Sequence, residues 1–135
     1  MYKEIPTIIL CGGIGTRLKE ETEFKPKPMV SIGGKPMLWH IMKIYSHWGY
    51  NKFILALGYK GEMIKDYFSK NKEDGFEIIF ADTGLESETG ERILKAQRYI
   101  VQDEFMVTYG DGVSDINLNK LVDLHRNQKT IGTIT

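Results

Sequence analysis

Cysteine, net charge and long apolar runs are scarce in this 135-residue sequence. The single cysteine, Cys11, excludes an internal disulfide framework and a cysteine-based zinc site, and it favours a reducing compartment. Eighteen Lys and Arg residues balance eighteen Asp and Glu residues, so bulk charge attracts neither nucleic acid nor a membrane. The apolar runs are too short for a membrane span, and the first residues lack the pattern of a signal peptide. We therefore expect a cytoplasmic protein with no nucleic-acid or membrane partner.

The composition is that of a folded domain. Hydrophobic residues make up 41% of the chain and charged residues 27%, which are ordinary values for globular proteins. A chain of this length can bury roughly two thirds of its unfolded surface, enough for a real core. Residues 1–135 thus form one domain or part of a larger one.

Five β-rich runs alternate with helical patterns along the chain. The runs cover 7–11, 52–57, 76–81, 105–109 and 130–135, and the helical patterns cover 38–48, 63–68, 93–100 and 118–125. Pro36 is suited to the first turn of the first helix, and Gly49 to its end. Strands that alternate with helices predict an α/β fold, with a mostly parallel sheet and helices on both faces.

The sequence ends on the strand-like run 130–135, with no helix or turn after it. A buried parallel strand as the last element is one interpretation. The other, which we favour, is that residues 1–135 are the front part of a longer fold, truncated after the fifth strand.

A glycine-rich loop follows the first run, with the sequence Cys-Gly-Gly-Ile-Gly-Thr-Arg-Leu at 11–18. Glycines after a parallel strand let backbone N–H groups approach phosphate oxygens. The dinucleotide-binding fingerprint is excluded because Leu18 stands where it needs Gly or Ala. The Walker A motif is excluded because Pro36 follows Gly34-Lys35. Spacing alone leaves a purely structural turn as the alternative.

Four cations, Arg17, Lys25, Lys27 and Lys35, lie in or just after the loop. Pro26 and Pro28 restrict the residues before them to extended geometry, so we expect Lys25 and Lys27 to project from an open backbone rather than a helix. Fixed cations beside bare amides favour phosphate binding. Nearby glutamates keep a solvated surface loop as the alternative.

Several ordered motifs extend this pattern over nearly the whole chain: GGIGTRL, KPKPM, VSIGGKPMLWHIMK, GYKGEMIKDYF, ADTG, TGERI and YGDGVSDI. Together they resemble the sugar-nucleotide pyrophosphorylases, and within them the branch that makes CDP-glucose from CTP and glucose 1-phosphate. The resemblance implies a Rossmann-like nucleotidyltransferase fold, with residues 1–135 as its nucleotide-binding N-terminal part. It also implies Mg²⁺ as cofactor.

The resemblance assigns roles on the phosphate side of the site. Arg17 would neutralise the leaving pyrophosphate, and Lys27 would draw the two reacting phosphates together. The amides of Gly12, Gly13 and Gly15 would hold the β- and γ-phosphates. The other nucleotide-binding positions on this side would be Leu10, Cys11, Ile14, Thr16 and Gly110. An in-line displacement at phosphorus needs no side-chain nucleophile, which fits the lack of a plausible Ser or Cys triad.

Asp111 stands between Gly110 and Gly112, directly after the fourth β-rich run. In a doubly wound sheet this run is expected beside the first one, where ligands bind at the carboxyl ends of the strands. Asp111 is therefore our candidate Mg²⁺ ligand, because magnesium usually takes one or two carboxylates together with phosphates and water. The alternative is an ordinary Asp-Gly turn.

The resemblance places base recognition around Thr83, Thr89 and Gly90, although such residues are also common in caps and turns. This chain departs from the family where Glu91 replaces a usual glycine. It also lacks most of a family insertion between the second and third runs that tends to serve subunit contacts, which bears on a possible homo-oligomer. Two rival functions stay open: a nucleotide-binding module without chemistry, and a pyrophosphorylase that uses UTP or dTTP.

Overall fold

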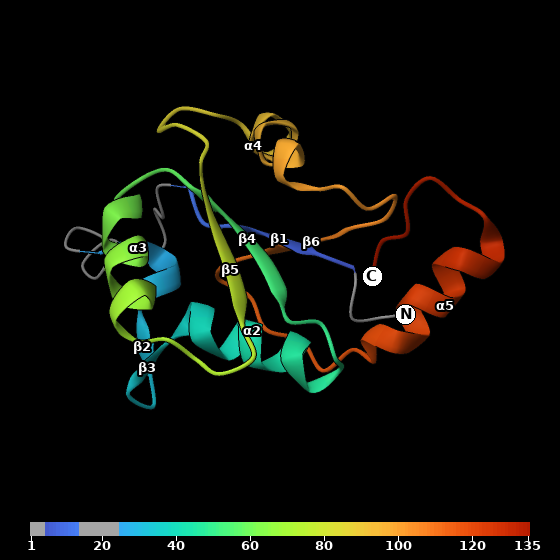
Figure 1. Ribbon diagram of the computed structural model, residues 1–135, viewed down its shortest axis with the longest axis horizontal. Coiled ribbons are helices and arrows are strands. Elements are labelled where there is room, and N and C mark those ends of the chain that lie inside the picture. The colour runs from blue at the N-terminus through green and yellow to red at the C-terminus, as the bar shows by residue number, and fades with distance from the viewer. Residues whose placement is uncertain (1–4, 14–24) are drawn as a thin grey trace.

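The computed structural model describes residues 5–13 and 25–135 (Figure 1). Its centre is a four-stranded parallel sheet with the order β5-β4-β1-β6. The strands are β1 (Thr7–Leu10), β4 (Lys52–Leu57), β5 (Glu77–Asp82) and β6 (Met106–Tyr109). Four of the five predicted β-rich runs are thus confirmed. The expected proximity of the first and fourth runs is confirmed as well, because β1 pairs with β6 from Thr7↔Met106 to Leu10↔Tyr109.

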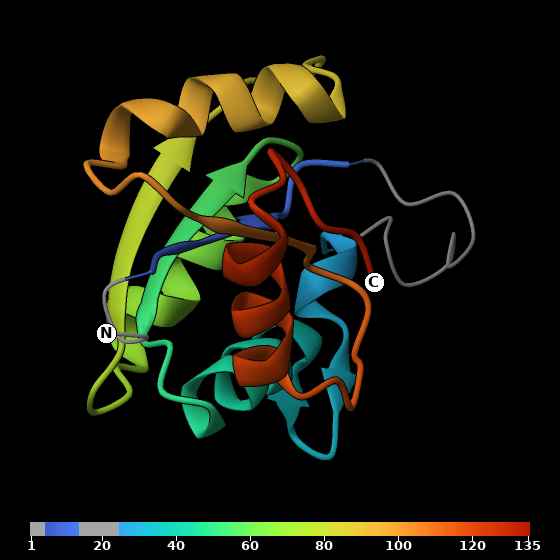
Figure 2. The same ribbon diagram turned by 90° about the vertical axis from the view of Figure 1, so that its right-hand side faces the viewer.

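Helices cover both faces of the sheet, as the alternating pattern predicts. They are α2 (Met37–His47), α3 (Gly61–Lys70), α4 (Thr89–Ala96) and α5 (Leu118–Gln128), with short 3₁₀ turns η2 (Lys27–Met29) and η3 (Gln97–Tyr99). Figure 2 shows α4 on one side of the sheet, with α2, α3 and α5 on the other. No helix within the described residues is long and apolar enough to cross a membrane.

The two faces of the sheet build two separate parts of the core. Ile9, Phe53 and Leu55 face α2 and α3, and all three are fully buried. Ile8 and Ile54, the alternate residues of the same strands, pack toward α4. Apart from Thr7 and Lys52, which begin the two strands, the side chains on both faces of β1 and β4 are apolar, as expected of parallel strands covered on both faces.

A small hairpin precedes α2. Strands β2 (Ser31–Ile32) and β3 (Lys35–Pro36) pair antiparallel, and Gly33 and Gly34 form the turn with φ values of 60° and 84°. Two positive φ angles in succession define the hairpin turn that best matches strand twist, and glycine adopts them without strain. We expected Pro36 in the first turn of the helix. It belongs to the hairpin instead, and α2 begins at the next residue, Met37. Gly49, with φ of 99°, follows the end of α2 as predicted.

The fifth β-rich run is not a strand. Residues 130–135 pair with no strand in the described part of the chain, and Ile131 and Ile134 are fully exposed. A hydrogen bond of 2.9 Å joins Thr133 Oγ1 to His125 Nδ1 of α5. The predicted strand was wrong because β-branched composition alone does not provide the neighbouring strand that the ladder needs.

Candidate functional site

The loops after β1 and β6 meet at the carboxyl edge of the sheet. The Gly110 amide donates to the Leu10 carbonyl at 2.9 Å, and the Cys11 amide donates to the Ala56 carbonyl of β4 at 3.0 Å. Gly12 is buried, whereas Gly13 is exposed. The first residues of the glycine loop are thus fixed against two neighbouring strands. Ile14, Gly15, Thr16 and Arg17 lie outside the described residues.

Lys27 and Asp111, which sequence reasoning assigned to phosphate and metal, lie side by side. The Lys27 ammonium is 2.8 Å from Asp111 Oδ2, and their side chains are 22% and 32% exposed. This pair joins η2 to the loop after β6 and leaves both groups accessible to solvent. An anion or a cation that binds here would meet an opposite charge already in place.

The backbone at Lys27 differs from the extended geometry that we expected. Lys27 opens the 3₁₀ turn η2, in which the Val30 amide donates to the Lys27 carbonyl at 3.1 Å. Pro28 restricts its predecessor but is compatible with the first turn of a helix, because its missing N–H has no intrahelical partner there. The turn brings Pro28 into a buried position and leaves Lys27 on the side of Asp111.

The segment after β5 holds the residues assigned to base recognition. Thr83 is 1% exposed, and its hydroxyl donates to the Leu57 carbonyl at 2.8 Å and accepts from Arg92 at 2.9 Å. Its side-chain hydrogen-bonding groups are therefore used within the protein. Thr89 and Gly90 begin α4 and are exposed. Within this set, they are the two residues open to a ligand.

Arg92 is the main residue of this region that sequence reasoning missed. It is 5% exposed, and its guanidinium reaches the Gly12 carbonyl at 3.1 Å and the Gly84 carbonyl at 2.6 Å. The available signal was its spacing of four residues from Ala96, which is fully buried, because such spacing puts both on one helix face. A cation on the buried face of a helix requires polar partners.

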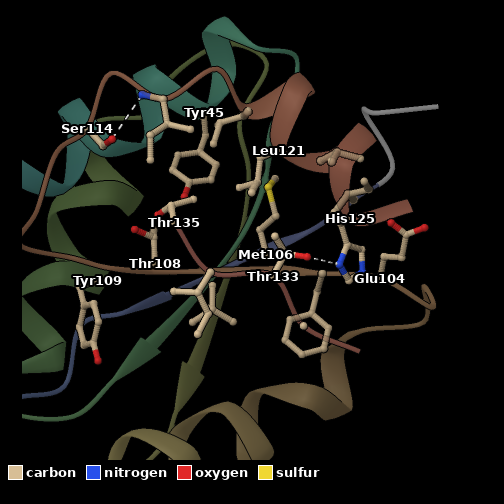
Figure 3. A pocket seen from close by; sticks show the side chains of 18 of the residues that line it. Tyr45, Glu104, Met106, Thr108, Tyr109, Ser114, Leu121, His125, Thr133 and Thr135 are labelled. Carbon is tan, nitrogen blue, oxygen red and sulfur yellow. Dashed lines mark hydrogen bonds between the residues drawn. The ribbon is translucent and has the colours of Figure 1, made fainter. Parts of the chain in front are cut away.

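A cavity of about 670 Å³ is lined by none of the candidate site residues (Figure 3). It runs along β6, α2, α5 and residues 131–135, and it reaches Gly112 next to Asp111. Its walls are mostly apolar. Burial raises the pKa of Tyr45, whose hydroxyl interacts with Thr108 inside the cavity. Because the cavity walls are mostly apolar, the candidate site is instead the cluster of Lys27, Asp111 and the glycines at the carboxyl edge of the sheet.

Within the described parts of the chain, no group of three or more His, Cys, Asp and Glu residues forms a metal cluster. Asp111 is a single, half-buried carboxylate at a strand end, paired with a lysine. A donor set of this kind matches magnesium, which needs few protein ligands when phosphates and water supply the others.

In parallel α/β sheets ligands bind at the carboxyl ends of the strands, and this is where the chain places its glycines, Lys27 and Asp111. The Nucleotidyl transferase family model matches residues 6–135, so the chain belongs to this family. This finding confirms the resemblance drawn from the sequence motifs.

The curated relatives agree with the assignment. The chain is 44% identical over 148 residues to the probable glucose-1-phosphate cytidylyltransferase of Bacillus subtilis (strain 168), with 95% of this chain and 58% of the relative covered. It is 42% identical over 150 residues to the glucose-1-phosphate cytidylyltransferase of Salmonella typhimurium, with the same coverage. The chain therefore spans somewhat more than half the length of these relatives.

Solved structures show the same fold. HddC from Yersinia pseudotuberculosis, in complex with GMP-PN, matches with a TM-score of 0.80 and 33% identity over 90% of this chain and 54% of that one. A UDP-glucose pyrophosphorylase in complex with UDP-glucose matches with a TM-score of 0.75 at 19% identity, over 93% of this chain and 54% of that one. The α/β nucleotidyltransferase architecture is thereby confirmed.

We predict that the Cys11 thiol resists alkylation in the folded protein. Burial raises its pKa far above the usual value, with a smaller contribution from the Asp111 carboxylate, and only the thiolate reacts. Iodoacetamide at pH 8 should modify the folded chain at least about 100-fold more slowly than the urea-unfolded chain, since each pKa unit removes tenfold of the thiolate. Because the chain has one cysteine, mass spectrometry reads the rate directly. Similar rates in both states would contradict the buried position.

Proposed function

We propose that this chain is the nucleotide-binding part of an enzyme that transfers a cytidylyl group from CTP to glucose 1-phosphate, giving CDP-glucose and pyrophosphate. The observation that carries the proposal is the Lys27–Asp111 pair, at 2.8 Å, beside the glycine loop. The identities of 42–44% with glucose-1-phosphate cytidylyltransferases favour CTP over UTP and dTTP.

On the phosphate side, the amides of Gly12 and Gly13 would hold oxygens of the triphosphate. The adjoining backbone of Leu10, Cys11 and Gly110 sets the position of these amides through hydrogen bonds between strands. The sequence assigns Ile14, Gly15, Thr16 and Arg17 to the same contact. Bare amides and fixed cations that need no rearrangement are the groups that best stabilise charge on transferring phosphates.

Mg²⁺ fits the charge and donor pattern at Asp111, and when bound it would offset the charge on the phosphate oxygens. Lys27 already neutralises part of the Asp111 charge, so the pair presents one donor cation and one acceptor anion to the ligand. When phosphate arrives, the Lys27 ammonium can turn from the carboxylate to phosphate oxygens and leave Asp111 free to accept a cation.

The reaction would be an in-line displacement. An oxygen of glucose 1-phosphate attacks the α-phosphorus of CTP, the bond from that phosphorus to the bridging oxygen breaks, and pyrophosphate leaves. Lys27 would bring the two phosphate groups together against their mutual repulsion. Thr89 and Gly90 would contact the base, while Thr83, through its buried hydrogen bonds, would shape that part of the site.

A second candidate is a module that binds the nucleotide without chemistry. It is favoured by the extent of the alignments, because the chain matches 58% of the length of each cytidylyltransferase relative. The two candidates share the triphosphate site and differ in whether the sugar phosphate is held beside it.

Replacing Lys27 with Ala should weaken CTP binding about 10–100-fold, because a hydrogen bond to a charged group is worth about 1.5–3 kcal/mol. Isothermal titration calorimetry with Mg²⁺ present measures the affinity. Lys65→Ala, on the exposed side of α3, is the matched control and should bind as the parent chain does. Equal affinities for Lys27→Ala and the parent chain would remove the proposed phosphate contact.

Asp111→Asn should abolish the Mg²⁺ dependence of CTP binding while the fold is kept, because the two side chains are nearly isosteric. The physical reason is that the substitution removes the only charge that Asp111 offers to a cation. Titrations of CTP with Mg²⁺ and with EDTA, on the parent chain and the variant, measure this dependence. A metal effect of the same size in both proteins would identify Asp111 as a turn residue.

The 135-residue chain should bind CTP and turn it over too slowly to detect. A sugar phosphate that is not held in place loses the proximity contribution, which is worth about 7–11 kcal/mol. The assay is CTP-dependent pyrophosphate release with glucose 1-phosphate and Mg²⁺. A rate near one per second would contradict this expectation and support a complete transferase site in the chain.

A further inference from the structure

Arg92 lies where three loops meet at the carboxyl edge of the sheet. Its Nη2 group donates to the Gly12 carbonyl after β1, at 3.1 Å, and to the Leu85 carbonyl after β5, at 3.1 Å. Its Nη1 group donates to Thr83 Oγ1 at 2.9 Å and to the Gly84 carbonyl at 2.6 Å. One side chain of α4 thus connects the glycine loop to the segment assigned to the base.

Two glycines make room for this guanidinium. A Cβ atom at Gly12 would lie 2.1 Å from Arg92 Nη1, and one at Gly58, in the loop after β4, would lie 2.5 Å from the same atom. The Gly58 Cβ would also come within 2.8 Å of the Gly84 carbonyl oxygen. Any side chain at either position would displace Arg92 or the loops, so the close approach itself requires glycine.

The partners of Arg92 are neutral oxygens. Among the described residues, no carboxylate forms an ion pair with it, and its side chain is held by three carbonyls and one hydroxyl. A buried charge is costly unless hydrogen bonds satisfy it. The planar fork of the guanidinium can reach acceptors on separate loops at once, whereas the single ammonium of a lysine cannot hold the same arrangement.

The Gly12 carbonyl has a second donor, the Tyr59 amide of the loop after β4, at 3.3 Å. Arg92 and Tyr59 therefore fix the orientation of the same peptide group. Since the peptide bond is planar, the direction of the Gly12 carbonyl also sets the direction of the Gly13 N–H. That N–H belongs to the group of amides proposed to face the triphosphate.

We propose that Arg92 is a positioning residue for the phosphate half of the site. It holds the Gly12 peptide so that the Gly13 amide faces the triphosphate, and it ties this geometry to the segment that includes Thr83, Gly84 and Leu85. This role rests on the proposed nucleotide site, but it requires no contact between Arg92 and phosphate.

The test uses two probes, CTP and inorganic tripolyphosphate, each with Mg²⁺. Tripolyphosphate has no base, so it reports on the phosphate half alone. Arg92→Met and Arg92→Lys should each bind both probes about tenfold or more weakly than the parent chain, as loss of charge-assisted hydrogen bonds implies. Gly58→Ala keeps the arginine in the sequence but crowds its guanidinium, so it should also weaken the binding of both probes. Urea unfolding verifies that each variant is folded under the titration conditions, and Arg92→Lys and Gly58→Ala carry the test if Arg92→Met does not fold.

Two control variants match these changes. Arg98→Met removes an exposed arginine that stacks on Tyr99, and Gly132→Ala adds a methyl group where no atom lies within 4 Å. Both should bind CTP and tripolyphosphate as the parent chain does.

Each outcome decides the proposal. Loss of CTP binding with unchanged tripolyphosphate binding would overturn it and make Arg92 a base contact. Full rescue by Arg92→Lys, or lower stability with unchanged affinities, would overturn it and leave a structural role.

If the parent chain binds neither probe, the proposed function fails, and hydrogen exchange still tests the positioning role. The Tyr59 amide should then exchange about tenfold or more faster in Arg92→Lys than in the parent chain, and equal rates would overturn the role.

Discussion

Strand β1 pairs in parallel with β4 on one side and with β6 on the other, and the arrangement of the site follows from these two ladders. Parallel pairing brings the carboxyl ends of all four strands to one edge, so residues from distant parts of the sequence become neighbours. Leu10 and Tyr109 stand opposite each other, and the next residues are the start of the glycine loop and Gly110. A slip of this register by one residue would exchange the faces on which Ile8 and Ile9 pack, so that each side chain would meet the neighbours of the other.

Electrostatics at this edge is local. The chain as a whole carries no net charge, yet Lys27 and Asp111 form a pair that salt screens only in part, since both side chains are half-buried. Arg92 adds a buried cation, whose charge opposes the rise in the pKa of Cys11 that burial causes. A neutral protein can therefore present a strong field to a small anion over a few residues without attracting polyanions over its whole surface.

The sequence was sufficient for those features that depend on local pattern or on the ends of strands. Buried runs such as 52–57 and the i, i+4 spacing in α2 predict their elements because burial imposes the period. The proximity of the first and fourth runs followed from their expected places in a doubly wound sheet, whereas the Lys27–Asp111 pair itself was not predicted. The run 130–135 misled because a strand depends on its neighbour. Arg92 was missed because its partners, Gly12 and Gly84, are contacts between loops that no local pattern encodes.

The two halves of the site use their polar groups differently. The Thr83 hydroxyl and the Gly84 and Leu85 carbonyls are engaged by Arg92 or by the sheet, so little hydrogen-bonding capacity of this segment is left for a base. In the proposed phosphate half, Gly13 is exposed, and the ion-pair partner that the described residues offer Lys27 is Asp111, which a ligand can replace. If the proposed function holds, the binding energy of the nucleotide should therefore come mainly from its triphosphate. Discrimination among bases then depends on the shape that the buried network gives to the segment before α4, where an unpaired polar group on a wrong base would be costly.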